Sequence, residues 1–245
     1  MHDDRLLTER RLDRVLRERI RPAVHGATVP LQVAAWPVPG EPVPPAEGLA
    51  AEYRPVEVGE PWGRPWGTTW FLFHAVVPPE WAVQEVVAVI DLGFGGSPGF
   101  SAEALIYLPD GSPVHGLHPR QRTVRLSRLA PPPASPARPA GEVRFFVEAA
   151  ANPSIERPVT WLGDTLTAGD KPLYQLRQAE LAVFHAEVWD LVHDLEVLGQ
   201  LMHELPVDGP RRWEILRAVE RALDTLSLDD VPGTAAAARR ELAPA

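Results

Sequence analysis

Two glutamates lie in segments of the sequence whose neighbouring residues are apolar. Glu103 lies in "AEALIYL" and Glu148 lies in "VRFFVEAAA". Paired carboxylates are the groups with which most glycosidases cleave a glycosidic bond, one as acid and the other as nucleophile or base. The sequence alone does not place the two glutamates together. A glutamate on the solvated side of an alternating strand is the simpler interpretation, and we favour it.

Two sets of residues have spacings that are compatible with metal binding. His115 and His118 form "HGLH" at an expected strand end and turn, where no carboxylate follows at a suitable spacing. Asp190, His193 and Asp194 lie at i, i+3 and i+4 of an expected helix, which is a geometry that can hold a metal ion. We favour exposed loop histidines for the first set and a charged outer helix face for the second. The sequence therefore assigns no metal ligand.

Other catalytic motifs are absent from the sequence. The glycine-rich stretch "GFGGSPGF" at 93–100 lacks the lysine and the following hydroxyl residue of a phosphate-binding loop. No Gly-x-Ser-x-Gly or His-Glu-x-x-His motif occurs. The chain contains no cysteine, which excludes disulfides, thiolate metal ligands and a thiol nucleophile.

Four tryptophans lie close together in "PWGRPWGTTWFLFHAVVPPEW", which runs from Pro61 to Trp81. Indole rings stack on sugar faces, so Trp62, Trp66, Trp70 and Trp81 could form a carbohydrate platform. Tryptophan also anchors the edge of a β-sandwich, because its ring buries a large area while its N–H finds a partner. We favour the packing role for these rings.

The elements that would position these residues change in type along the chain. Apolar spacing predicts a helix over 3–21 that ends at Pro22. Short runs rich in Val, Ile and Phe follow, with a tight-turn signal at 109–111, and they predict antiparallel strands. Helical periodicity returns after residue 175. We therefore expect an α+β chain: an N-terminal helix and lead-in (1–30), an antiparallel β-sandwich of jelly-roll or galactose-binding-like type (31–160), and a C-terminal helical hairpin or connector (161–245).

Composition narrows the classes of partner. The 245-residue chain has a formal net charge of −9, which argues against a nucleic-acid surface. No segment approaches the roughly 20 apolar residues of a membrane span. The N-terminus is charged where a signal peptide would be apolar, so we expect a cytoplasmic protein without membrane partners.

Several segments together resemble the N-terminal region of bacterial α-mannosidases of glycoside hydrolase family 38, in the branch shared with the fungal vacuolar enzymes. The tryptophan-rich stretch, "VVAVIDLGFGGSPGFSAEALIYLPDGSPVHGLHPR", "EVRFFVEAAANP" and "PLYQLRQAELAVFHAEVWDLVHDLEVLGQLMHEL" occur in the order of that family. The resemblance extends from about residue 3 to the last residue. It implies a non-catalytic sandwich that precedes a catalytic barrel, so the isolated chain is expected to be inactive.

The resemblance also implies where the chemistry lies. The family enzymes hold zinc or a similar divalent ion with two aspartates and two histidines, and one aspartate is the nucleophile of a retaining mechanism. Their Gly-His-x-His-Ile-Asp motif is not present here, so no catalytic or metal residue is assigned and no cofactor is expected in this chain. The implied partners are the catalytic domain of the same polypeptide and its α-mannoside substrate. An apolar surface that would cover the barrel is exposed without it, so we also expect that the chain could form a homo-oligomer.

Three residues remain as candidates for contact with a carbohydrate or with a neighbouring domain. Trp66, Glu103 and Asn152 are polar or aromatic residues at expected loop edges, from which they could reach a sugar hydroxyl. Two other roles stay open for the whole chain. It could be a self-standing carbohydrate-binding module that uses the tryptophans, or a scaffold whose exposed helix seam binds a partner protein.

Overall fold

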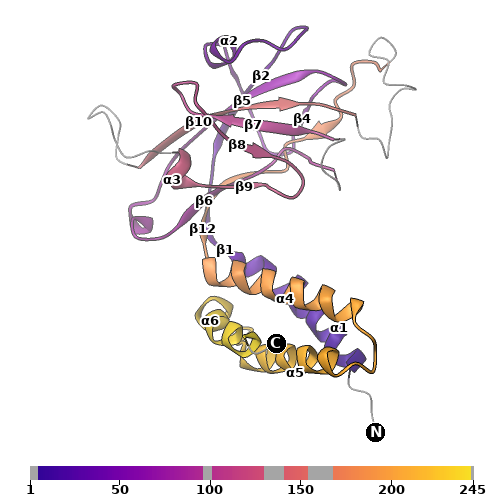
Figure 1. Cartoon of the computed structure of the whole chain (residues 1–245). Helices are drawn as coiled ribbons and strands as arrows, with labels where there is room; N and C mark the ends of the chain where they lie inside the picture. The colour runs from indigo at the N-terminus through magenta and orange to yellow at the C-terminus, as the bar shows by residue number, and fades with distance from the viewer. Residues whose placement is uncertain (1–4, 96–100, 130–140, 154–167, 244–245) are drawn as a thin grey trace. The chain divides into compact units, whose positions relative to one another are not determined.

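The chain folds into two compact units in a computed structural model that describes residues 5–95, 101–129, 141–153 and 168–243 (Figure 1). One unit comprises the strands from Ala27 to Val183. The other is helical and combines the N-terminal segment up to Gly26 with the segment from Phe184 onward. The α+β fold expected from the sequence is confirmed.

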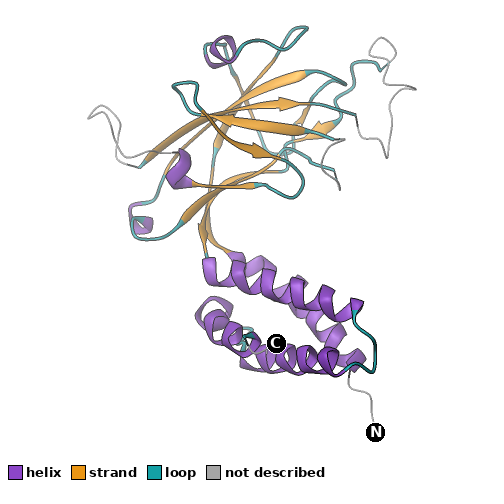
Figure 2. Cartoon of the chain, viewed as in Figure 1, coloured by secondary structure: helices purple, strands orange, loops and turns teal. Residues whose placement is uncertain are grey.

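The strand-rich unit contains a six-stranded sheet, a four-stranded sheet and a small two-stranded sheet (Figure 2). The strand orders are β3-β2-β5-β10-β7-β8, β1-β12-β6-β9 and β11-β4. Neighbouring strands with a defined register run antiparallel, as in a jelly roll. The strands are β1 (His25–Pro30), β2 (Gln32–Pro37), β3 (Arg54–Val56), β4 (Pro61–Trp62), β5 (Thr68–Val76), β6 (Val86–Asp91), β7 (Glu103–Tyr107), β8 (Pro113–Leu117), β9 (Thr123–Arg125), β10 (Glu142–Ala150), β11 (Tyr174–Gln175) and β12 (Gln178–Phe184).

Alternation of side chains along the six-stranded sheet builds the main core. Phe71 and Phe73 on β5 point to the same face as Phe145 on β10, because alternate residues of a strand share a face. The Phe73 and Phe145 rings stack with centroids 5.1 Å apart. All six residues of β6 are buried, which explains the apolar run that precedes its terminal Asp91.

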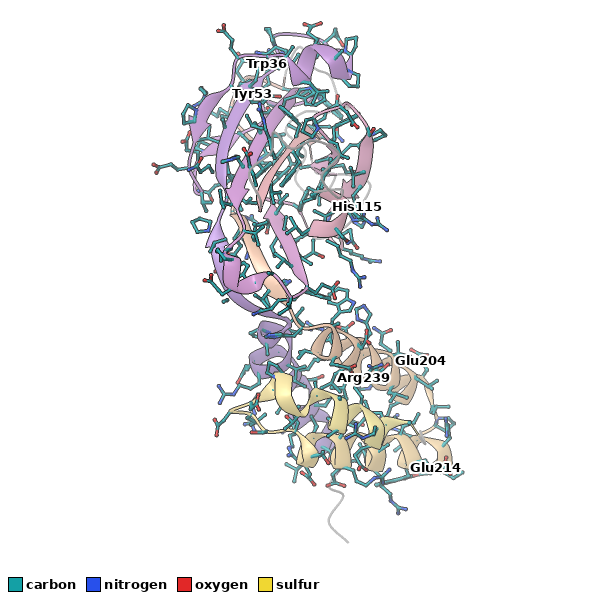
Figure 3. The ribbon with its side chains drawn as sticks, turned by 90° about the vertical axis from the view of Figure 1, so that its left-hand side faces the viewer. Trp36, Tyr53, His115, Glu204, Glu214 and Arg239 are labelled. Carbon is teal, nitrogen blue, oxygen red and sulfur yellow. The ribbon has the colours of Figure 1, made fainter. Side chains whose placement is uncertain are left out.

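The opposite face of the same sheet is covered by α2 (Pro45–Leu49) and its flanking loops. Trp70 is fully buried there beside Tyr107, with ring centroids 5.2 Å apart. Gly48 of α2 lies so close that a Cβ at this position would collide with the Trp70 indole. Tyr53, labelled in Figure 3, donates a hydrogen bond from its hydroxyl to the Gly48 carbonyl (2.7 Å). This outer cluster fixes the loop that follows β2.

The helical unit has a mainly aliphatic core. The predicted N-terminal helix is present as α1 and continues as a π-helical turn and a 3-10 turn that contains Pro22. Pro210 begins α5, and the Asp230 carboxylate caps α6 by accepting a hydrogen bond from the Gly233 N–H (3.0 Å). The elements are α1 (Arg5–Val15), the π-helical turn (Leu16–Ile20), the 3-10 turn (Arg21–Val24), α4 (Ala186–Glu204), α5 (Pro210–Thr225) and α6 (Val231–Leu242).

Strands continue further along the chain than the sequence indicated. Two strands, β11 (Tyr174–Gln175) and β12 (Gln178–Phe184), lie within the expected helical connector. The segment "AELAVF" is apolar enough to form either a helix or a strand. It forms a strand because it pairs with the buried β6. The helices of the structure include none, within the described ranges, that is long and apolar enough to cross a membrane.

Candidate functional site

Most of the clustered tryptophans are buried, as the packing interpretation requires. Trp62 and Trp81 are each 6% exposed and Trp70 is not exposed at all. Trp66 is different, with 41% of its surface exposed. The four rings therefore do not form an open platform for a sugar.

Trp66 lies in a strained turn. Its φ of 64° is the one positive value at a non-glycine position in the described part of the chain, and bulky residues rarely adopt this left-handed conformation. The Gly67 N–H donates to the Arg64 carbonyl (2.9 Å), which closes the turn around Pro65. The Trp66 N–H donates to the Ala151 carbonyl (3.0 Å), so the turn is attached to the end of β10. These backbone hydrogen bonds hold the strained residue in place.

The three candidate contact residues lie at one end of the six-stranded sheet. Thr68 of β5 pairs with Ala150 of β10, which pairs in turn with Glu103 of β7. Trp66 precedes Thr68 by two residues, and Asn152 follows Ala150 by two. The Asn152 carbonyl accepts a hydrogen bond from the Tyr174 hydroxyl. The sheet register thus places the three candidates in one region.

The two glutamates lie on the same face of neighbouring strands. Glu148 pairs with Leu105, two residues from Glu103, so the two carboxylates are diagonal neighbours. The Tyr107 hydroxyl donates to Glu148 (3.1 Å). Burial, followed by the charge of Glu148, raises the pKa of Tyr107. Glu148 thus serves as the partner of a tyrosine in the outer aromatic cluster.

A pocket that the sequence did not indicate opens within the strand-rich unit. It has a volume of about 230 Å³ and lies among β2, β3, β4, β5 and the segment 170–176. It is lined by Ala35, Pro37, Val38, Arg54, Val56, Glu60, Pro61, Trp62, Gly63, Arg64, Thr68, Thr69, Phe71, Asp170, Pro172 and Leu176. The Gly-Arg-Pro-Trp-Gly turn beside it was the available sequence signal, because two glycines around a proline mark a fixed turn.

The aromatic wall of the pocket is held rigidly. The Trp62 indole N–H donates to the Leu92 carbonyl (2.7 Å), and its ring packs edge-on against Phe71 with centroids 5.3 Å apart. Tyr174 lies against another part of the Trp62 ring at 5.4 Å. A ring fixed in this way can form the wall of a ligand site without losing further freedom on binding.

Comparison with known proteins assigns the chain to a family. A family model described as "Alpha-mannosidase, jelly roll domain" matches residues 29–182. The chain belongs to this α-mannosidase family. The human protein "Alpha-mannosidase 2C1" is 31% identical over 201 residues, which are 80% of this chain and 18% of the human protein. The mouse protein of the same name is 29% identical over 188 residues, or 75% of this chain and 16% of the mouse protein. The chain therefore spans less than a fifth of the length of these relatives.

The residues with metal-compatible spacing do not fit the divalent-ion site that this α-mannosidase family implies. No group of three or more His, Asp or Glu side chains suited to a metal ion occurs among the residues that the structure describes. His115 lies on β8 opposite Ile106, while the His118 Nδ1 accepts a hydrogen bond from the Arg120 N–H (3.3 Å). Burial, followed by the charges of Arg128 and His118, lowers the pKa of His115.

The second set, on α4, is occupied by an arginine. Arg239 of α6, labelled in Figure 3, makes ion pairs of 2.9 Å with Glu187, Asp190 and Asp194. These pairs, led by the hydrogen bond to Asp194, raise the pKa of Arg239. The His193 ring contacts Trp189 and hydrogen-bonds its carbonyl (2.9 Å). The set therefore joins two helices, and a metal ion would have to displace the guanidinium.

Proposed function

We propose that this chain is the N-terminal, non-catalytic accessory part of an α-mannosidase that hydrolyses terminal α-linked mannose. The observation that carries the proposal is the match of residues 29–182 to the jelly-roll domain of α-mannosidases. Both relatives named as α-mannosidases are much longer than the region they share with this chain. Most of such an enzyme, including its hydrolytic centre, would thus lie in other parts of the polypeptide.

The contacts of the candidate residues support an accessory role. Glu148 is engaged by Tyr107, and the acidic residues of α4 are engaged by Arg239. A retaining glycosidase needs two carboxylates about 5–5.5 Å apart on either side of a bound sugar. The divalent ion of the family enzymes, zinc or a similar cation, would belong to the catalytic part.

An exposed apolar stripe on α4 supports docking to the rest of that polypeptide. Trp189, Val197 and Leu201 follow one another along one side of the helix and are 38%, 62% and 41% exposed. The opposite side of α4 is buried in the helical core. Exposed apolar side chains gathered on one helix face mark interaction sites. The shared region covers only 18% of the human relative, so we propose the catalytic part of the same protein as the occupant.

Hydrolysis of a chromogenic α-mannoside tests the accessory role. The 245-residue chain is compared, with added zinc or cobalt, with a protein extended by the sequence that its gene encodes downstream. We expect turnover only in the extended protein. Turnover by the short chain above a metal-free control would contradict the proposal and would direct mutagenesis to Glu103 and Glu148.

Introduction of negative charge on the stripe tests the docking surface. The double substitution Val197→Glu and Leu201→Glu in the extended protein is expected to detach the helical unit and make it sensitive to limited proteolysis. Arg217→Glu on α5 is the matched control, because it makes the same change in net charge as the double substitution at an exposed position of another helix. Equal proteolysis of both variants and the unchanged protein would refute the docking proposal.

We also propose a cytoplasmic location, which fractionation of the native cells would test.

A further inference from the structure

We infer that the pocket bounded by Trp62, Thr69 and Asp170 binds a single neutral sugar ring. The pocket lies entirely within the strand-rich unit, and neither the family match nor the relatives assign a ligand to it. The inference of a sugar follows from the charges, free polar groups and shape of the pocket. The choice of mannose as the first sugar to test rests on the proposed function.

The charges around the pocket balance. Two arginines and two carboxylates line it, so it has no excess of either sign. Arg54 and Glu60 already approach each other to 3.6 Å, and the Arg64 guanidinium donates to the Gly40 carbonyl (3.4 Å). Phosphate or carboxylate ligands require a surplus of cations or oriented N–H groups. A neutral ligand with many hydroxyls fits this lining better.

Three polar side chains of the pocket are available to a ligand. In the described ranges, the side chains of Thr68, Thr69 and Asp170 have no hydrogen-bond partner in the protein. Thr69 as a residue is only 3% exposed, but its hydroxyl is not one of the fully buried polar atoms without a partner, which agrees with an oxygen that opens onto the pocket. A sugar supplies both donors and acceptors, so it can satisfy two threonine hydroxyls and a carboxylate at the same time.

The remaining walls match the apolar face of a sugar ring. Trp62, Phe71, Val38 and Leu176 line the pocket with carbon atoms. Its volume of about 230 Å³ lies below the roughly 300–1,000 Å³ of pockets that hold drug-sized molecules. The pocket therefore admits one ring and not an extended oligosaccharide.

Backbone hydrogen bonds hold the two sides of the pocket together before any ligand binds. The Gly59 N–H donates to the Leu176 carbonyl (2.7 Å), and the Leu176 N–H donates to the Glu60 carbonyl (3.0 Å). The Leu173 N–H donates to the Gly63 carbonyl (2.9 Å). A preformed site loses little conformational entropy on binding, which allows a small ligand to bind measurably.

Titration of the 245-residue chain with methyl α-mannoside, followed by amide NMR shifts, tests the inference. We expect saturable shifts at Thr69, Gly63 and Leu176 with a Kd of about 1 mM, near the weak end of specific recognition. Glucose, galactose and inorganic phosphate are titrated in parallel. Binding of phosphate without sugar, or no shift with any sugar at ~10 mM, would overturn the inference.

Two substitutions locate the binding. Thr69→Val keeps the shape of the side chain and removes its hydroxyl, and Asp170→Ala removes an exposed carboxylate. Each should weaken binding roughly fivefold to tenfold, which corresponds to one lost hydrogen bond. Thr123→Val on β9 is the matched control and should bind normally. Trp66→Ala tests the alternative that the exposed ring is the sugar contact.

The outcomes separate this inference from the proposed function. Unchanged binding by both Thr69→Val and Asp170→Ala would refute the pocket site, as would loss of binding confined to Trp66→Ala. Sugar binding by the short chain with no mannosidase activity in the extended protein would leave the pocket standing and remove the proposed function. Activity in the extended protein without sugar binding by the short chain would support the proposed function and refute the sugar site in the pocket.

Discussion

The two units of the chain use their polar side chains in different ways. In the strand-rich unit, Thr69 and Asp170 face a pocket without protein partners. In the helical unit, Arg239 binds carboxylates of α4, and Arg212 binds Glu9 at 2.9 Å. Polar groups that are paired with one another in this way hold helices together and have less capacity left for a ligand, although the Arg212 Nε is buried without a partner. Recognition is therefore to be sought in the sandwich and assembly in the helices.

The cores of the two units also differ in the types of residue that they contain. Aromatic rings fill the sandwich, where Phe73 stacks on Phe145 and Trp62 meets Phe71 edge-on. The buried core of the helical unit consists of Leu, Val, Ile, Ala and one Met. The two cores therefore differ in residue type, since the first is rich in aromatic rings and the second is aliphatic.

Truncation of one core residue in each unit tests whether the two cores are independent. Phe73→Ala should lower the free energy of unfolding by about 3–5 kcal/mol, and Leu195→Ala by about 2–5 kcal/mol, because each leaves a cavity among buried side chains. Hydrogen exchange read by peptide should show lost protection within 27–183 for the first and within both segments of the helical unit, up to residue 26 and from residue 184 onward, for the second. Equal loss in both units from either substitution would show that they unfold together.

Loss of the buried ion pair of the helical unit should have the next largest effect on the free energy of unfolding. The side chains of Arg212 and Glu9 are 9% and 13% exposed. Arg212 also donates to the Leu205 carbonyl (3.0 Å). Arg212→Ala leaves a carboxylate without its partner and should cost about 3 kcal/mol in chemical denaturation.

Replacement of the whole pair sharpens this test. Arg212→Met combined with Glu9→Met removes both charges and keeps similar volume, so it should recover most of the lost stability. If the double variant is as unstable as Arg212→Ala, the pair contributes through geometry that methionine cannot reproduce. The loss of stability in Arg212→Ala would then not come from the unpaired charge of Glu9 alone.

Periodicity was sufficient to predict most of the fold. Leucines at spacings of three and four identified the helices, and short runs such as "VVAVID" identified strands, because each pattern buries one face of its element. The segment 178–184 escaped this reasoning. Its apolar residues suit a helix or a strand, and only the adjacent β6 determines which forms.

The candidate site was less accessible from sequence. Trp66, Glu103 and Asn152 were predicted as edge residues, and the sheet register does bring their positions to one end of the sheet. The pocket was missed because Thr69, Arg54 and Asp170 are far apart in the chain and are ordinary residue types. Their proximity depends on tertiary packing of β3, β5 and the segment before β11, which no local pattern encodes.

The Arg239 cluster tests how much the exposed ion pairs of the helical unit contribute. Its carboxylates are about half exposed, and solvent-exposed pairs typically contribute 0–1 kcal/mol. We expect Arg239→Ala to lower stability by about 1 kcal/mol at low salt and by less in 1 M salt, where charges are screened. Arg240→Ala, at an exposed neighbouring position, is the control and should have no measurable effect. A salt-independent loss would instead indicate packing of the arginine stem.

The smallest expected effect is a pH dependence of stability that arises from His115 and should be confined to the strand-rich unit. Burial, with the nearby Arg128 and His118, lowers the pKa of His115 below its ordinary value of 6.5. The unfolded chain therefore binds a proton more readily than the folded one. This contribution to stability is present above pH 6.5 and is lost as the pH falls toward the lowered pKa. His115→Gln should flatten the pH dependence of strand protection in this range, measured by hydrogen exchange. A pH profile that runs parallel to that of the unchanged protein would exclude His115 as its source and would leave the remaining acid sensitivity to other groups.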